Sequence, residues 1–240
     1  MGEHATATSM YNEGGQLANW SELQHKALGE TWVDRAYALF KDTGIIPEGT
    51  NLGDFRMLVA ASNVPAHAVY FAKNLAKDFM PDGAEMAGKT APVVVALDIA
   101  LDPLKQRVTS EDSLERVRIV RVNADSTRLP FTSESFDLIT DFEGALWYKL
   151  DSGGDPRDLL TGYFDSLKAG GSLVIDNVFR GCDESSNLFT GGMLARSGII
   201  TKAGKIDLGD NRSFSVEALQ GIRGVDSFLV LHKDTQTALA

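Results

Sequence analysis

The stretch that decides the fold is Pro92-Val93-Val94-Val95-Ala96-Leu97-Asp98, an apolar and largely β-branched run that ends in an acid. A continuous apolar run of this length is typical of a strand covered on both faces, as in a parallel sheet. Outward from it, apolar runs of similar kind predict further strands at residues 56–61, 117–122, 136–140, 172–175 and 227–232.

Apolar residues at helical spacing separate most of these strands. They predict helices at residues 21–40, 65–79, 101–117, 155–168 and 215–222. Alternation of strands and helices predicts an α/β fold with right-handed crossovers, that is, a doubly wound, mostly parallel sheet with helices on both faces.

The chain length suits one large domain, or one domain with a lid. Residues 43–54 hold three glycines and one proline, which is typical of a connector. We therefore predict an N-terminal helical cap or lid over residues 1–44 and a main domain over residues 45–240.

Composition narrows the class of function. The 240 residues carry a formal net charge of −10, and no cluster of Lys and Arg offsets it, so the surface would repel the phosphate backbone of nucleic acids. No apolar run approaches the length of about 20 residues that spans a bilayer, and the polar, acidic start does not resemble a secretion signal. Cys182 is the only cysteine, which excludes an internal disulfide. We expect a cytoplasmic protein that acts on a small molecule, with no nucleic acid and no membrane as partner; a homodimer is compatible with these features.

Acids follow the predicted strands at the edge where open parallel sheets bind ligands. Asp98 ends one strand, Asp125 follows the next, and Asp141 and Asp176 come directly after two others. Asp98 could accept both ribose hydroxyls of an adenosine ligand, and Asp125 could meet the exocyclic amine of adenine. Each also has a structural interpretation, because Asp98 could cap the following helix and Asp125 could form an Asx-turn.

Four segments, in order, resemble the motifs of a known family. They are Val94-Val95-Ala96-Leu97-Asp98-Ile99-Ala100, Asn123-Ala124-Asp125 with Leu129-Pro130-Phe131, Ser135-Phe136-Asp137-Leu138-Ile139, and Leu167-Lys168-Ala169-Gly170-Gly171-Ser172-Leu173-Val174-Ile175. With them the chain resembles the class I S-adenosylmethionine (SAM)-dependent methyltransferases, which have a Rossmann-like fold. The resemblance implies SAM as cofactor, with Asp98 at the ribose, Asp125 at the adenine edge, and Ile99 and Ser126 beside them.

The family's glycine-rich first motif corresponds here to Val59-Ala60-Ala61-Ser62-Asn63-Val64-Pro65. The glycine positions fall on Ala61, Asn63 and Pro65, and the family's preceding acid falls on Val59. Ala is small and Asn tolerates the left-handed region. We therefore expect Ala61 and Asn63 to pass beside the cofactor, whose methionine end lacks its usual acidic anchor.

A second resemblance concerns Asp141, Asp176 and Asn177. Metal-dependent catechol-type O-methyltransferases hold Mg²⁺ with Asp, Asp and Asn at these places, and oxygen ligands suit that cation. The lysine that those enzymes place soon after the first Asp is absent, and the Leu-Pro-Phe segment is typical of the metal-free branch. Mg²⁺ is thus an alternative that we do not favour, and no metal ligand is predicted; otherwise Asp176 and Asn177 cap a turn.

The sequence therefore predicts a SAM-dependent methyltransferase for a small-molecule acceptor. Alignment supplies much of the catalysis in an in-line displacement, and an oxygen or nitrogen nucleophile can also need a base. Asp141 is predicted as that catalytic base, ahead of Glu143 and His67, because the strand end places it nearest the methyl group. The substrate is expected under a lid formed by the N-terminal helix and residues 179–209. The alternative is a methyltransferase-like protein that uses SAM differently, or that has lost catalysis and acts as a binding or partner subunit.

Overall fold

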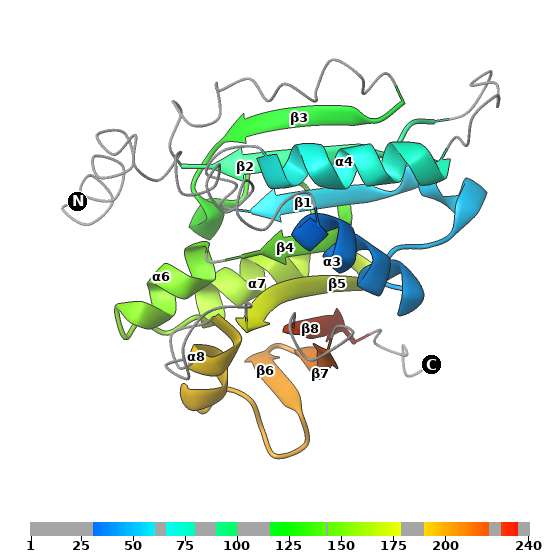
Figure 1. The fold of residues 1–240 in the computed structure, drawn as a ribbon. Helices are drawn as coiled ribbons and strands as arrows, with labels where there is room; N and C mark the ends of the chain where they lie inside the picture. Colours follow the sequence, from blue (N-terminus) through cyan, green and yellow to red (C-terminus); the bar gives the residue numbers. More distant parts are fainter. Residues whose placement is uncertain are drawn as a thin grey trace, which may run out of the picture. The chain divides into compact units, whose positions relative to one another are not determined.

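The computed structural model describes residues 31–60, 66–79, 90–99, 116–142, 144–178, 190–220 and 227–234. The chain forms two compact units, residues 1–125 and 126–240, and each is described by itself. Strands and helices alternate along the chain (Figure 1), and the predicted α/β, Rossmann-like fold class is confirmed.

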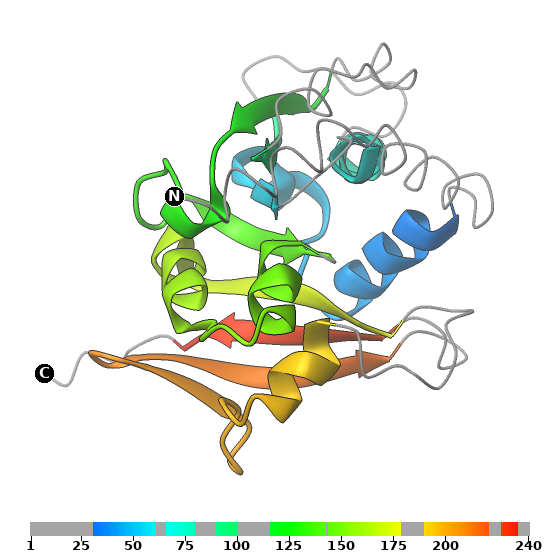
Figure 2. The same cartoon turned by 90° about the vertical axis from the view of Figure 1, so that its left-hand side faces the viewer.

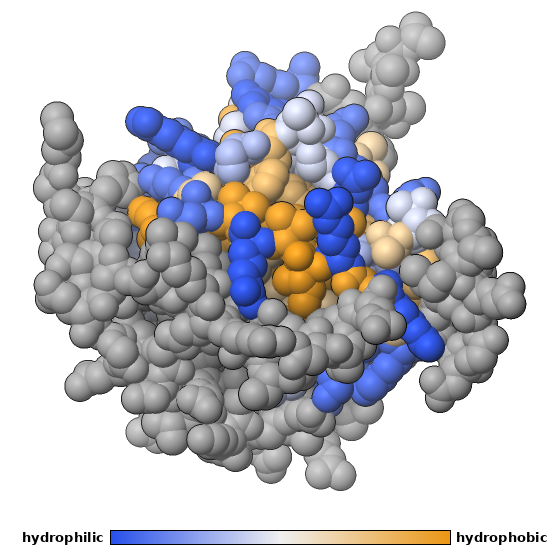
Figure 3. All heavy atoms as spheres, turned by 90° about the horizontal axis from the view of Figure 1, so that it is seen from above, coloured by the Kyte–Doolittle hydropathy of each residue, from blue (hydrophilic) through white to orange (hydrophobic). Residues whose placement is uncertain are grey.

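The first unit contains three parallel strands in the order β3-β2-β1. They are β1 (Arg56–Ala60), β2 (Val93–Asp98) and β3 (Arg118–Asn123). The central strand β2 is the apolar run with which the sequence argument began, and its residues from Val94 onward are buried. Side chains of β3 are exposed or half-buried instead, as expected at the edge of a sheet. Figure 3 shows hydrophilic and apolar side chains side by side on the face that lies toward β3 in Figure 1.

The described residues of this unit also form two helices and a 3₁₀ turn: α3 (Thr31–Asp42), η1 (Gly49–Asp54) and α4 (Ala66–Phe79). α4 packs on β2 and β3, and α3 packs on α4. Asp78 of α4 joins the two helices, because it accepts hydrogen bonds from Tyr37 Oη at 2.9 Å and Lys41 Nζ at 2.8 Å. α3 ends before Gly44, as predicted, and Gly44 has a φ of 76°.

The second unit contains five strands in the order β4-β5-β8-β7-β6. They are β4 (Phe136–Asp141), β5 (Leu167–Val178), β6 (Lys205–Gly209), β7 (Arg212–Gln220) and β8 (Ser227–Lys233). β4 and β5 are parallel, whereas β8, β7 and β6 are added in antiparallel pairs, which Figure 2 shows edge-on.

In the described part of this unit there are four helical segments: η3 (Ser126–Arg128), α6 (Ala145–Asp151), α7 (Arg157–Ser166) and α8 (Thr190–Arg196). α7 packs on β5, β6 and β7, and its Phe164 ring meets the Phe214 ring of β7 edge to face at 5.2 Å. α8 packs on both β5 and α6. The described part of the predicted lid, from Thr190 onward, consists of α8, β6 and their connection.

The predicted helix at 215–222 is wrong, because this region lies largely in strand β7. The sequence Ser213-Phe214-Ser215-Val216-Glu217 alternates with a period of two, and pairing with β8 on one side and β6 on the other satisfies its backbone. The helix predicted to reach residue 168 ends at Ser166 instead, and β5 begins at Leu167 rather than at 172.

The Gly170-Gly171 pair lies inside β5, and does not end the helix. Gly170 has a φ of 76°, a conformation that side chains disfavour. A Cβ atom at Gly171 would lie 3.0 Å from the carbonyl oxygens of Asp137 and Lys168. Gly170 is therefore favoured by its backbone conformation, and Gly171 by the close approach of β5 to β4.

Residues 1–30, 61–65 and 100–115, on which other predictions fall, lie outside the described residues. They include the start of the first helix, the degenerate first motif and most of the helix at 101–117. The boundary between a cap at 1–44 and a domain at 45–240 stays a prediction. None of the described helices is long and apolar enough to cross a membrane.

Candidate cofactor and acceptor site

Asp98 is the last residue of β2, at the carboxyl end of the strand, as the sequence predicts. Its side chain is buried, with 4% of its surface exposed. Ile99 follows in a bend and is half-buried. A carboxylate at this edge can accept hydrogen bonds from a ligand with hydroxyl groups, and this is the edge at which open parallel sheets bind ligands.

Asn123, the last residue of β3, fixes the turn that carries Asp98. Its Nδ2 donates to the carbonyl oxygens of Asp98 at 3.0 Å and Ile99 at 2.9 Å. The Ala124 amide donates to the same Asp98 oxygen at 3.0 Å. These bonds hold the chain beyond β2 against the end of β3, so the backbone that carries the Asp98 side chain is fixed by the neighbouring strand.

Asp125 is half-buried at the end of the first unit, and Ser126 is buried as the first residue of η3 in the second. Both follow the carboxyl end of β3, as predicted. Ala61 and Asn63 lie outside the described residues, so their predicted contact with the cofactor stays a prediction.

Asp141 is the last residue of β4 and is fully buried. Its Oδ2 accepts a hydrogen bond from Tyr163 Oη of α7 at 2.8 Å and from the Leu146 amide in the first turn of α6 at 3.0 Å. Asp141 Oδ1 is buried and has no hydrogen-bond partner among the described residues. The side chain thus joins β4 to two helices and keeps one acceptor atom unused.

The pKa of Asp141 is raised to about 7, mainly by burial and to a smaller extent by the nearby Asp176 carboxylate. The hydrogen bonds from Tyr163 and Leu146 act in the opposite direction, because they stabilise the charged form. A carboxyl group with a pKa near 7 can hold or release a proton at neutral pH, as acid–base catalysis requires.

Asp176 of β5 is also fully buried. Its Oδ1 accepts from Thr190 Oγ1 at 2.9 Å and its Oδ2 from the Thr190 amide at 3.3 Å, at the start of α8. Three of the four carboxylate oxygens of Asp141 and Asp176 therefore accept a hydrogen bond from the protein, and the fourth is Asp141 Oδ1.

Among the described residues, no three His, Cys, Asp or Glu side chains lie close enough together to hold a metal ion. Asn177 lies in β5, but its side chain is outside the described part of the chain.

Sequence reasoning missed three residues of this arrangement. Asn123 stood in a quoted motif, and its place at a strand end could have suggested a role. Tyr163 and Thr190 gave no local indication, because they lie 22 and 14 residues from the acids that they contact. Of the other candidate bases, His67 is half-buried in the first turn of α4, and Glu143 lies outside the described residues.

Residues 83–175 match the family model of a methyltransferase domain. The match spans β2, β3, β4 and the first part of β5, together with the four motif segments. Residues 83–175 therefore carry a methyltransferase domain. The match begins at residue 83, so it does not include residues 59–65, the segment that corresponds to the glycine-rich motif but lacks its glycines. Among curated proteins, no sequence matches the chain.

Solved structures share the fold of the methyltransferase domain. One is a candidate SAM-dependent methyltransferase from Methanococcus maripaludis, with a TM-score of 0.55 and 14% identity over 92% of this chain and 94% of that one. A second is the Burkholderia thailandensis 1,6-didemethyltoxoflavin-N1-methyltransferase, with a TM-score of 0.52 and 15% identity; the match covers 98% of this chain and 92% of that one. A third is the Haemonchus contortus phosphoethanolamine N-methyltransferase 1, with a TM-score of 0.52 and 13% identity; the match covers 98% of this chain and 49% of that one. At these identities the likeness is one of fold.

Proposed function

We propose that this chain transfers the methyl group of SAM to a small-molecule acceptor in the cytoplasm, as a monomer or a homodimer, without nucleic acid or membrane as partner. The observation that carries the proposal is the methyltransferase-domain match over residues 83–175, whose acids Asp98 and Asp125 follow strands β2 and β3. The net charge of −10 favours a small molecule over nucleic acid. Two of the similar structures hold small molecules with S-adenosylhomocysteine.

The residues present suit SAM, because Asp98 is a buried carboxylate on a turn that Asn123 fixes. Asp98 and Ile99 would hold the ribose of SAM, and Asp125 and Ser126 would hold its adenine. Ala61 and Asn63 would pass beside the methionine end of SAM. When bound, SAM would supply an electrophilic methyl carbon to the acceptor's lone pair, and S-adenosylhomocysteine would be the second product because the electrons of the carbon–sulfur bond would stay on sulfur.

The acceptor's proton must go to a base, and Asp141 is our proposed residue for this step. Its pKa of about 7 supports that role. Its complete burial, and the two donors on Oδ2, also support a positioning role in which Asp141 fixes the start of α6. The two roles use different oxygens: Oδ2 holds α6 and α7, and Oδ1, which has no hydrogen-bond partner among the described residues, is the atom that would take the proton.

The test is SAM binding by calorimetry, followed by mass-spectrometric detection of S-adenosylhomocysteine with mixtures of small phenols, amines and carboxylic acids. We expect wild-type protein to bind SAM, Asp98→Ala to bind it more weakly, and the exposed-site control Asp42→Ala to bind it normally. Folded protein that binds no SAM would refute the proposal. Binding without turnover of any acceptor would favour the alternative of a methyltransferase-like binding protein.

A further inference from the structure

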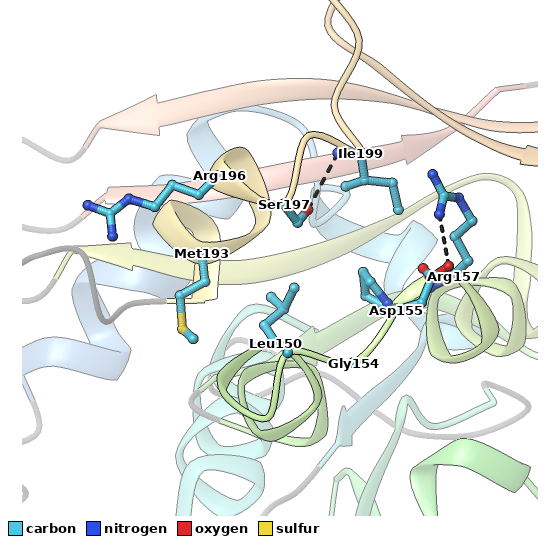
Figure 4. A pocket seen from close by; sticks show the side chains of 10 residues that line it. Leu150, Gly154, Asp155, Arg157, Met193, Arg196, Ser197 and Ile199 are labelled. Atoms are coloured by element: carbon cyan, nitrogen blue, oxygen red, sulfur yellow. Dashed lines mark hydrogen bonds and ion pairs between the residues drawn. The ribbon is translucent and has the colours of Figure 1, made fainter.

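A pocket in the second unit lies at the ends of α6 and α8 and at the beginning of α7 (Figure 4). It is an open pocket with a volume of about 630 Å³, which suits a small organic molecule. None of the residues predicted to bind SAM lines it. Its lining comprises Leu150, Gly153, Gly154, Asp155, Pro156, Arg157, Met193, Arg196, Ser197 and Ile199.

The lining combines apolar surface with a positive charge. Leu150 of α6, Met193 of α8 and Ile199 supply apolar side chains. The two arginines lie at opposite ends in Figure 4. Arg157 is paired with Asp155 at 2.8 Å, whereas Arg196 has no acidic partner among the described residues.

The pocket therefore carries one positive charge in excess, in a chain whose net charge is −10. A guanidinium group binds carboxylate and phosphate through paired, charge-assisted hydrogen bonds. Charge and apolar surface together select a ligand with an apolar body and an anionic end.

The two helices connect this pocket to the buried acids. α6 begins where the Leu146 amide donates to Asp141, and α8 begins where Thr190 donates to Asp176. Each helix has seven residues, which at 1.5 Å per residue is about 10 Å. The pocket is lined by the final residues of both helices, so it lies about one helix length from the carboxyl ends of β4 and β5.

We propose that this pocket binds the distal end of the methyl acceptor, and that this end is an apolar group with a carboxylate or phosphate. The inference rests on the proposed function, since it assumes that the acceptor is methylated near the ends of β4 and β5. It adds the substrate class: an elongated organic anion about 10 Å long whose methylated atom and anionic group lie at opposite ends.

The probe for the test is 6-hydroxy-2-naphthoate, which has a nucleophilic oxygen at one end and a carboxylate at the other. Its neutral amide is the matched compound. We expect wild-type protein to prefer the carboxylate in calorimetric titrations. Arg196→Gln should lower the affinity for the carboxylate about ten-fold and leave that for the amide unchanged, because only the charged hydrogen bonds are lost. Arg196→Lys should retain part of the preference, and Arg118→Gln, at an exposed arginine of β3, should retain all of it.

Equal affinity of wild-type protein and Arg196→Gln for the carboxylate would overturn the inference. The second measurement is methyl transfer to the same two compounds, in which wild-type protein should prefer the carboxylate and Arg196→Gln should not. Binding that depends on Arg196 without this change in preference would make the anion a separate effector, which also overturns the assignment to the acceptor. Wild-type protein and all variants should bind SAM with the same affinity. If none of them binds SAM, the proposed function itself fails.

Discussion

Replacement of Asp141 by Asn should make the free energy of unfolding less dependent on pH. Asp141 is fully buried at the end of β4, and burial raises the pKa of its carboxyl from 3.8 to about 7. The folded protein therefore binds more protons at this site than the unfolded chain does. Stability from this group is fully present below about pH 3.8 and is lost as the pH rises through about 7.

The size of the effect follows from the two pKa values. The difference between 3.8 and about 7 corresponds to about 4 kcal/mol in the free energy of unfolding at alkaline pH. About 2 kcal/mol of this is lost between about pH 5.5 and about pH 8. Asn is neutral and nearly isosteric, and its amide oxygen can still accept from Tyr163 and Leu146. Between about pH 5.5 and about pH 8, the free energy of unfolding of the variant should therefore rise by about 2 kcal/mol relative to that of wild type. This change does not depend on the stability of the variant at about pH 5.5.

Urea unfolding at both pH values measures this difference. The matched control is Asp158→Asn, which neutralises an exposed carboxylate in the first turn of α7 and should keep the wild-type pH dependence. If wild type and Asp141→Asn lose the same free energy between the two pH values, Asp141 does not carry a raised pKa and the argument from burial is wrong.

Three further predictions concern the first unit. Asp98→Ala should weaken SAM binding by about 1.5–3 kcal/mol, the value of hydrogen bonds to a charged group, with little change in the melting temperature without ligand; calorimetry and thermal unfolding measure the two. Asn123→Ala removes the bonds to the Asp98 and Ile99 carbonyls, so it should lower the free energy of unfolding by about 1 kcal/mol and also weaken SAM binding. Tyr37→Phe removes one donor to Asp78 and should cost about 1 kcal/mol in urea unfolding without changing SAM affinity.

Each of these predictions has an outcome that contradicts it. Unfolding of Asp98→Ala, with unchanged affinity in the folded fraction, would show that Asp98 only caps the following segment. Normal SAM binding by Asn123→Ala would mean that its two hydrogen bonds do not set the direction of Asp98. Loss of SAM affinity in Tyr37→Phe would place the α3–α4 contact in the cofactor site.

Much of the parallel part of the fold was predictable because its pattern is local. The apolar run that ends at Asp98 is a strand within one residue of its predicted start, and the strands before and after it also lie where their apolar runs predicted. The same local reasoning failed at residues 215–222, because a short segment can fit both the helical period of about 3.6 and the strand period of two. Pairing with β6 and β8 decides it, and both partners are determined elsewhere in the chain.

The sequence by itself determined the α/β class, the resemblance to methyltransferases, and the acids at the ends of the strands, because the end of an apolar run marks the carboxyl end of a strand. Only the tertiary structure decided what those acids contact. Tyr163 reaches Asp141 from another helix, and Thr190 reaches Asp176 across a long connection. The pocket beside Arg196 is likewise assembled from three helices. Burial, a raised pKa and the lining of a pocket are properties of such long-range packing, and no local pattern encodes them.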